Sequence, residues 1–268
     1  MPWSLEQAYD AYPQIEEEFS AALDQSLEPC GPDLLYDLVA RLGLAPGAVA
    51  LDVGCGEGRQ AVTLARRFGL QVTGIDPVSR HVEVARASAG PDGPAFAIGA
   101  AERIPAGRET ADLVWCRDVL VHVRELPGAY AEFRRVLRPD GHVLVYQMFG
   151  SELLEPREAA WLWATMGVVP ENADPARTET AIAAAGLRID ERLLIGSEWS
   201  EWVEERHHSA SRKLLHASRL QRNRASYVER YGPAACDMML GDCLWQVYAM
   251  IGKLERRVYL LSADRSGL

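Results

Sequence analysis

The segment from Leu51 to Arg59 combines residue types that suit a nucleoside-like cofactor. It carries Asp52 and then glycine at positions 54, 56 and 58, with Glu57 before the last glycine. Backbone without side chains can turn sharply and approach a ligand closely, and N–H groups at the start of a helix bind polar groups. A further acid, Asp76, follows 18 residues after Gly58. An acid at the end of the second strand can accept hydrogen bonds from both ribose hydroxyls.

The segment does not match the motifs of two phosphate-binding loops. A dinucleotide site has the spacing G-x-G-x-x-G, and Arg59 occupies the position of its third glycine. A P-loop needs a Lys followed by Ser or Thr, and no such pair follows here. The pattern therefore favours a nucleoside cofactor without a bound pyrophosphate.

Alternating strands and helices must hold these residues. Apolar runs without polar alternation predict strands buried on both faces, and apolar residues at helical spacing predict the helices between them. The predicted strands are 48–53, 71–75, 95–98, 112–116, 142–148, 187–195 and 257–263. Such alternation is typical of βαβ units with right-handed crossovers. The sequence thus predicts an α/β fold with a doubly wound, mainly parallel, seven-stranded sheet.

The remaining residues predict helical additions to this core. We expect an N-terminal helical segment at 1–45 that acts as a lid, and an α/β core at 46–195 that binds the cofactor. A helical insertion at 196–256 is expected to fold over the active site, and 257–268 to supply the last strand of the core sheet.

Six segments in this order and spacing resemble the class I S-adenosylmethionine-dependent methyltransferases, in their small-molecule, type 11-like branch. The resemblance covers roughly residues 48–148. It rests on Asp52-x-Gly54-x-Gly56-x-Gly58, Gly74-Ile75-Asp76, Gly99 to Pro105, Asp112 to Trp115, Val119 to Val123, and Arg135 to Gly141. It implies the Rossmann-like methyltransferase fold and S-adenosylmethionine as cofactor.

The resemblance also implies a role for each matching residue. The loop of Gly54, Cys55, Gly56 and Gly58 would wrap the methionine part of the cofactor, supported by Asp52. Asp76 would hold the ribose, with Pro77 beside the adenosine. The other implied contacts are Ala101 and Glu102 at the adenine, and Cys116 and Arg117 near the methionine moiety. Ala100 stands where family members often have an acid that binds the adenine amino group.

The acceptor side is less defined by the sequence. In this branch the N-terminal helix and the insertions commonly form a lid, which would exclude water. We expect the lid aromatics and neighbouring residues to line the acceptor pocket: Tyr9, Tyr12, Tyr146, Trp245 and Tyr248. His122 would lie near the mouth of the methyl-transfer pocket as a candidate general base, because histidine titrates near neutral pH.

Composition limits the partners. The chain has 28 basic and 38 acidic residues, a formal charge of −10, which argues against nucleic acid as partner. Five cysteines show no CxxC spacing, and His207 and His208 lack further assignable ligands, so no metal is expected. No apolar run reaches the ~18 residues of a membrane span, and no signal peptide is visible. These features predict a cytoplasmic protein that does not bind membranes, with lid helices that could pair in a homodimer.

The resulting hypothesis is methyl transfer to an oxygen, nitrogen or carbon atom of a small, natural-product-like acceptor by in-line displacement. Only two of the 28 basic residues are lysine, which hints at a GC-rich bacterial genome and secondary metabolism. Two alternatives stay open. One is a peptide or protein carboxylate methyltransferase that uses the basic stretch from Arg206 to Arg230. The other is a cofactor-binding protein that transfers no methyl group.

Overall fold

Seven strands form one sheet in the order β3-β2-β1-β4-β5-β7-β6. In the computed structural model, which describes residues 3–25 and 30–264, β1 to β5 run parallel and β7 lies antiparallel between β5 and β6. The strands are β1 Val49–Val53, β2 Gln71–Asp76, β3 Ala95–Ile98, β4 Ala111–Arg117, β5 Leu137–Gly150, β6 Leu187–Ile195 and β7 Leu254–Ala263. The predicted fold class is confirmed, and each of the seven predicted strands overlaps an observed strand, although β5 and β7 begin earlier than predicted.

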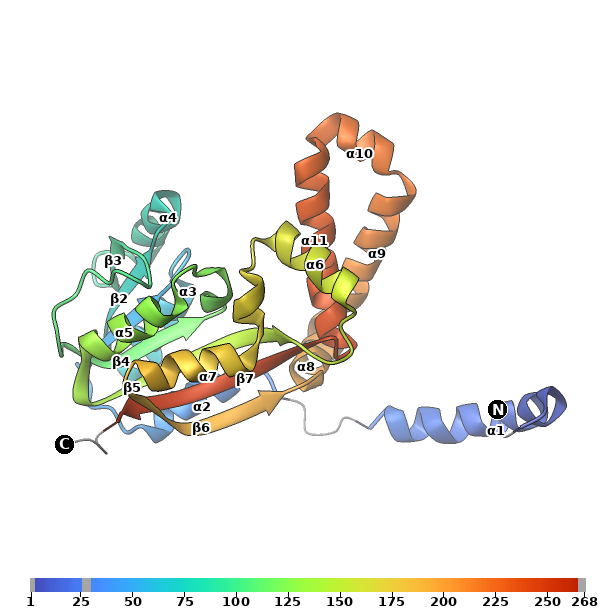
Figure 1. Ribbon diagram of the computed structural model, residues 1–268, viewed down its shortest axis with the longest axis horizontal. Coiled ribbons are helices and arrows are strands. Elements are labelled where there is room, and N and C mark those ends of the chain that lie inside the picture. Colours follow the sequence, from blue (N-terminus) through green and yellow to red (C-terminus); the bar gives the residue numbers. More distant parts are fainter. Residues whose placement is uncertain (1–2, 26–29, 265–268) are drawn as a thin grey trace.

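Helices cover both faces of this sheet (Figure 1). One face packs on α2 Asp33–Arg41, α3 Arg59–Phe68 and α4 Ser79–Ala89. The other packs on α5 Leu126–Val136 and α7 Pro175–Ala184. Successive residues of β4 alternate between the two cores: Leu113 and Trp115 enter the first, and Val114 and Cys116 the second. Because both faces are covered there, the central strands β1 and β4 are largely apolar, whereas β6 at the sheet edge alternates with charged residues.

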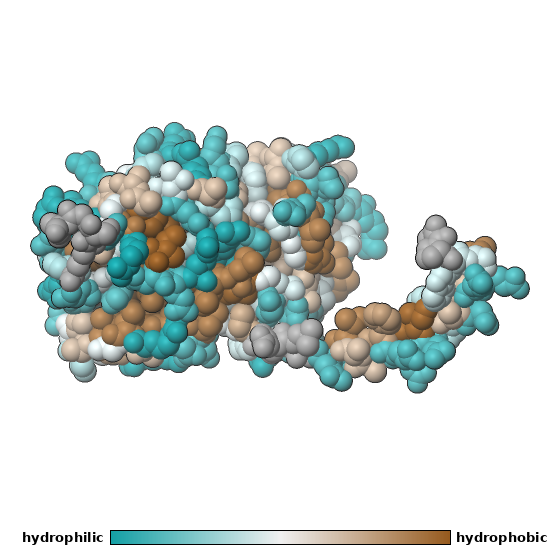
Figure 2. Space-filling view, turned by 60° about the horizontal axis from the view of Figure 1, so that its bottom comes forward, coloured by the Kyte–Doolittle hydropathy of each residue, from teal (hydrophilic) through white to brown (hydrophobic). Residues whose placement is uncertain are grey.

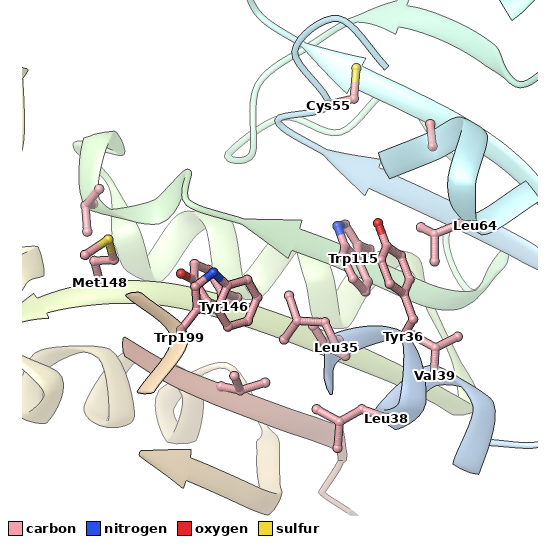
Figure 3. Packing of buried hydrophobic residues seen from close by; sticks show 14 of the residues in the cluster. Leu35, Tyr36, Leu38, Val39, Cys55, Leu64, Trp115, Tyr146, Met148 and Trp199 are labelled. Carbon is pink, nitrogen blue, oxygen red and sulfur yellow. The ribbon is translucent and has the colours of Figure 1, made fainter. Parts of the chain in front are cut away.

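The first core continues toward the carboxyl ends of β4 and β5 through aromatic side chains (Figure 3). Tyr36 of α2 stacks on Trp115, with ring centroids 5.4 Å apart. Further along, Tyr146 of β5 packs against Trp199 at 5.1 Å. This second contact joins the sheet to the insertion that follows β6.

The insertion consists of four helices, α8 Glu198–His207, α9 Ser209–Arg222, α10 Arg224–Tyr231 and α11 Pro233–Met250. The sequence predicted a helical insertion at 196–256, and within it the helices are separated at His208, which adopts φ 50°, and at Asn223, which leaves helical geometry. With α6 Pro156–Met166, which the sequence analysis did not predict, α9 to α11 stand up from one end of the sheet (Figure 1). The base of the insertion, rather than its full length, therefore faces the sheet.

Strand β7 begins at Leu254, three residues before its predicted start. This difference assigns Arg256 to the sheet instead of to the insertion. Residues 265–268 of the predicted last segment lie outside the described residues. Two short 3₁₀ turns complete the fold, η1 Leu120–His122 after β4 and η2 Pro170–Ala173 after α6.

The N-terminal helix α1, Leu5–Leu23, extends away from the sheet (Figure 1). Ser4 caps it in a capping box with Gln7. No residue of α1 is buried, and apolar side chains gather along one side of the helix (Figure 2). In this structure α1 does not cover the carboxyl ends of the strands.

Candidate functional site

The glycine loop after β1 has the backbone geometry that its sequence predicted. Gly54, Gly56 and Gly58 all have positive φ, at 78°, 51° and 84°. A Cβ on Gly54 would lie 2.1 Å from Val119 Cγ2, so this position also needs glycine for close packing. A Cβ on Gly56 would meet nothing within 4 Å. The loop therefore packs tightly on one side and leaves space for a ligand on the other.

Asp76 ties this loop to the end of β2. Its Oδ2 accepts a hydrogen bond from the Gly56 N–H at 2.9 Å, and its Oδ1 accepts one from the Val78 N–H at 2.9 Å. His81 Nδ1 lies 3.2 Å from Oδ1. The Ile75 carbonyl receives the N–H groups of Gly54 and Cys55 at 2.7 and 3.0 Å. Asp76 is thus held beside the loop, with lone pairs left that can accept hydroxyl donors.

Asp52 provides a test of whether a polar ligand fits here. The carboxyl is buried, and its Oδ2 has no hydrogen-bond partner among the described residues. Burial raises the pKa of Asp52 to about 7, against the lowering effects of the Ala61 N–H and the Arg117 charge. A buried polar atom without a partner is costly unless a ligand or water completes it. The loop therefore fits a cofactor with a donor group near Asp52, such as an amino group.

Apolar side chains lie open at the neighbouring strand ends. Val78 after β2 is 45% exposed, and Ile98 at the end of β3 is 56% exposed. Pro77 is exposed beside them, Ala101 is buried and Glu102 is half-buried. Exposed β-branched residues at this edge suit the flat apolar faces of an adenine ring. Val78 and Ile98 were not singled out by the sequence analysis.

The end of β4 connects the loop to a second feature. The Cys116 side chain is fully buried and burial raises the pKa of its thiol, so a contact with the methionine moiety would come from its backbone. Arg117 is half-buried, and its guanidinium lies 5.4 Å from the Tyr146 ring centre and 5.6 Å from that of Trp199. Its charge acts on Asp52 at one side, while its side chain lines a cavity at the other.

This cavity, of about 130 Å³, lies among the ends of β4, β5 and β7 and the base of the insertion. Its walls combine aromatic, hydroxyl and charged groups from separate parts of the chain. The lining residues that the argument uses are Arg117, Asp118, Tyr146, Trp199, Ser200, Trp245 and Arg256.

Asp118 is the acid in this cavity. It has φ 58°, an unusual conformation for a residue other than glycine, and its N–H donates to the Tyr146 carbonyl at 2.9 Å. The side chain is 45% exposed and forms part of the cavity wall. The surrounding protein raises the pKa of Asp118 to about 6, while Arg117, Arg256 and His122 lower it. Asp118 is therefore ionised at neutral pH and able to accept a proton.

His122 lies on η1, close enough for its charge to act on Asp118. Its Nδ1 donates to the Gly167 carbonyl at 3.0 Å, which leaves Nε2 as the proton acceptor. The ring is exposed and is not part of the cavity wall.

Two of the five predicted pocket residues lie in the cavity wall. Tyr146 is buried, and its hydroxyl accepts a hydrogen bond from Arg256 Nε at 2.9 Å. Trp245 of α11 donates from Nε1 to Met148 Sδ at 2.9 Å. Tyr248 instead donates to Glu158, in a cluster with Lys253 outside the cavity.

Tyr9 and Tyr12 lie on α1, 74% and 58% exposed, and do not reach the cavity in this structure. Their predicted contact with the acceptor thus has no support from this arrangement.

The sequence analysis missed Asp118, Trp199, Ser200 and Arg256 as cavity residues. Asp118 follows a β4 terminus that was already singled out, so its position was a usable signal. The other three come from α8 and β7, and no local pattern links them to residues near position 117. Among residues 3–25 and 30–264, no group of three or more His, Cys, Asp or Glu side chains could hold a metal ion. Over the same residues, no helix is long and apolar enough to cross a bilayer.

Comparison with known proteins agrees with this geometry. Residues 51–145 match the family model described as a methyltransferase domain. They contain the glycine loop, Asp76, Arg117 and Asp118. This part of the chain is therefore similar to a methyltransferase domain, in agreement with the resemblance to the class I S-adenosylmethionine-dependent methyltransferases that its motifs indicated.

Individual relatives cover different parts of the chain. An O-methyltransferase of Penicillium expansum, cnsE, is 34% identical over 125 residues, which are 45% of this chain and 45% of that protein. The chain thus spans less than half the length of this curated relative.

Two solved structures share the fold at low identity. One is a protein from Galdieria sulphuraria described as a putative sarcosine dimethylglycine methyltransferase, with TM-score 0.66 and 16% identity over 87% of this chain and 84% of that one. The other is the [4+2]-cyclase SpnF, with TM-score 0.66 and 24% identity over 86% of this chain and 81% of that one. At this identity both show the fold alone.

Proposed function

We propose that this chain is a methyltransferase that moves the methyl group of S-adenosylmethionine to an oxygen, nitrogen or carbon atom of a small acceptor. The observation that carries the proposal is Arg117, which joins the two parts of the site. Its charge acts on Asp52 below the glycine loop, and its side chain lines the cavity. A cofactor on the loop would therefore have its methionine end beside this polar cavity.

The chain's own residues would bind and orient both reactants. Gly54 to Gly58 and Asp76 would hold the cofactor. Asp52 Oδ2, which has no partner among the described residues, would accept a hydrogen bond from a donor group of the cofactor. When bound, S-adenosylmethionine supplies a methyl group on a positively charged sulfur. Trp199 and Trp245 would exclude water from the cavity, and holding an acceptor in line contributes much of the acceleration.

A hydroxyl or ammonium acceptor must also lose a proton, and Asp118 is placed to take it. Asp118 lines the cavity, whereas His122 lies outside its wall with Nε2 free. Asp118→Asn should then lower turnover about 100-fold with cofactor affinity unchanged, and His122→Gln should have a smaller effect. An acceptor that is already deprotonated, or a carbon acceptor of high nucleophilicity, needs neither residue.

The deciding experiment is calorimetric titration of the chain with S-adenosylmethionine and S-adenosylhomocysteine, repeated on Asp76→Ala. We expect micromolar binding that the substitution abolishes, followed by formation of S-adenosylhomocysteine when small acceptors are screened. Binding without product from any acceptor would favour the second possibility, a cofactor-binding protein whose reaction needs no methyl transfer. The fold of the [4+2]-cyclase SpnF is compatible with that possibility.

Methylation of a peptide carboxylate is less favoured by the structure of the basic stretch. Arg224 pairs with Asp237 at 2.7 Å, and Lys213 with Asp242, so α11 neutralises part of α9 and α10. Arg206 contacts the Trp202 ring and Glu205. These pairs reduce the positive charge available to an acidic peptide. The cytoplasmic location, the role in bacterial secondary metabolism, and the homodimer stay predictions from the sequence.

A further inference from the structure

Arg256 is a buried cation in the cavity without a carboxylate partner. It is only 4% exposed, and it lies on β7 directly opposite Met148 of β5. Its Nε donates to the Tyr146 hydroxyl at 2.9 Å, its Nη1 to the Gly196 carbonyl at 3.1 Å, and its Nη2 to the Ser200 hydroxyl at 2.7 Å. All three acceptors are neutral. Among the described residues, no carboxylate oxygen lies within 4 Å of this guanidinium.

A guanidinium carries five N–H groups, and three are used by these bonds. One N–H on Nη1 and one on Nη2 have no bond within the described residues, and the side chain forms part of the cavity wall. Buried charges in proteins are normally paired, because removal from water is costly unless an opposite charge replaces the lost hydration. The site thus holds a positive charge and two donors with nothing of opposite charge bonded to them.

The other charges in the cavity do not cancel it. Asp118 is the acid in the cavity wall and its charge interacts with that of Arg256, but its Oδ2 lies 3.9 Å from Arg117 Nε. The cavity wall therefore contains one carboxylate, Asp118, and two guanidinium groups, Arg117 and Arg256, so it retains one net positive charge. A bound sulfonium cofactor would add a further positive charge beside it. An acceptor that is neutral or cationic would leave this charge unbalanced.

We propose that the acceptor is an anion, and that Arg256 binds its carboxylate or an equivalent two-oxygen group. This inference rests on the proposed function, because it names the substrate class of the same cavity. The planar fork of arginine matches two oxygens of a carboxylate, which a lysine would not do as well. The three bonds to Tyr146, Gly196 and Ser200 fix the guanidinium in place, so little mobility is lost on binding. The cavity volume of about 130 Å³ suits a small acid or the acidic end of a larger molecule.

Matched acids and amides test the proposal without knowledge of the natural acceptor. The full chain, saturated with S-adenosylhomocysteine, is titrated calorimetrically with formate, acetate and benzoate, and with formamide, acetamide and benzamide. We expect at least one carboxylate to bind at least tenfold more tightly than its amide. If none of the three carboxylates binds up to 50 mM, or if each amide binds as well as its acid, the proposal is wrong.

Arg256→Met then assigns the anion to this residue. We expect carboxylate affinity to fall at least tenfold, to the level of the amide, while the affinity for S-adenosylhomocysteine stays within twofold. Arg257→Met is the matched control, because Arg257 is the next residue on β7 and pairs with Glu255 on the other side of the strand. If both variants weaken the carboxylate equally, or Arg256→Met leaves it unchanged, Arg256 is not the anion site.

Two further readouts separate other roles of Arg256. A more than tenfold loss of S-adenosylhomocysteine affinity in Arg256→Met, with an unchanged unfolding midpoint, would show that Arg256 binds the cofactor and would overturn the proposal. If Arg256→Met does not fold, Ser200→Ala replaces it. That change frees a donor on Nη2 and keeps the charge, so carboxylate binding should be unchanged or tighter, and a tenfold loss would contradict the proposal.

The proposed methyltransferase function is tested separately. Failure of the chain to bind S-adenosylhomocysteine would contradict that function, and the carboxylate titrations can still be done on the chain alone. Cofactor binding with no preference for acids would contradict only the anionic acceptor.

Discussion

The glycine loop and the acceptor cavity lie next to each other, yet they are built from different parts of the chain. In the loop, the backbone supplies the turns and the hydrogen-bond donors. Gly54 and Gly56 turn with positive φ, and three N–H groups bond to Ile75 and Asp76. In the cavity, side chains of β4, β5, β7, α8 and α11 supply the wall. The Arg256 bonds to Tyr146 and Ser200 join residues 110 and 56 positions apart.

This difference has a physical basis in the two ligands. A cofactor shared by many reactions can be held by a short backbone motif, which tolerates few substitutions because its turns need glycine. An acceptor must be distinguished by charge and shape, and such recognition uses side chains placed by distant segments. Substitutions in the loop should therefore weaken cofactor binding, and substitutions in the cavity should reduce selectivity for the acceptor.

The largest expected effect comes from Gly54→Ala. The added Cβ would lie 2.1 Å from Val119 Cγ2, and an alanine at φ 78° is strained as well. Strain and overpacking of about 3–4 kcal/mol correspond to a loss of cofactor affinity on the order of 100-fold or more. Titration calorimetry with S-adenosylhomocysteine measures it.

Gly43→Ala is the control for Gly54→Ala. Gly43 also has positive φ, at 60°, but a Cβ there would meet nothing within 4 Å and the residue lies before β1. Its substitution should leave cofactor affinity within about twofold, since it adds backbone strain without a contact at the site. Equal losses in both variants would show that general destabilisation, not the loop, explains the effect.

A smaller loss is expected for Asp76→Asn. The amide can keep one acceptor oxygen toward Gly56 or Val78 but loses the negative charge that we propose binds the ribose hydroxyls. Charge-assisted hydrogen bonds contribute about 1.5–3 kcal/mol, so cofactor affinity should fall roughly tenfold to 100-fold. Asp92→Asn, at an exposed acid in the loop after α4, serves as control. An unchanged affinity for Asp76→Asn would remove the assigned ribose contact.

The same division explains what the sequence could predict. The positions of the seven strands along the chain were predicted from apolar runs, and the loop was predicted from residues 52 to 58 with Asp76, because these signals are local. Helix α6, the breaks at His208 and Asn223, and the start of β7 at Leu254 were missed. They depend on packing at the end of the sheet, which no single segment encodes. Arg256 was assigned to the insertion for this reason, so its place in the cavity could not be seen.

The predicted lid role of residues 1–45 stays a prediction. The aromatic residues of α1 were read as part of the acceptor pocket by analogy with the family, whereas the structure leaves Tyr9 and Tyr12 exposed. The resemblance supplied matching motifs for the cofactor loop, whereas for the acceptor side it supplied only the common position of a lid.

Asp52 predicts a dependence of stability on pH. Its pKa is raised to about 7 in the folded chain, above its value in the unfolded chain, so the folded state holds the proton more tightly between pH 4 and 7. Stability without cofactor should therefore fall as pH rises through this range, and level off above about pH 7. Each pH unit of this range is worth about 1.4 kcal/mol, which gives an upper bound of about 4 kcal/mol.

Urea unfolding at pH 5 and pH 8, with and without Asp52→Asn, measures this dependence. The substitution should remove most of the loss between the two pH values, since asparagine does not titrate there. Asp92→Asn should retain it. A fall in stability that is equal in all three proteins would assign the pH dependence to other groups, and the unpaired Oδ2 of Asp52 would then be satisfied by water.

The smallest effect is expected from deletion of residues 1–24, which removes α1. The helix has no buried residue, so its loss should change the unfolding midpoint by no more than about 2 °C and cofactor affinity by less than about twofold. Differential scanning calorimetry and titration with S-adenosylhomocysteine measure these quantities.

Turnover with an acceptor is the informative third measurement. Because Leu5, Tyr9, Phe19 and Leu23 form an exposed apolar side (Figure 2), a large loss of turnover with unchanged cofactor affinity would mean that α1 closes on the cavity when the acceptor binds. Unchanged turnover would mean instead that the acceptor side is complete without α1, and that β7 and the base of the insertion define it.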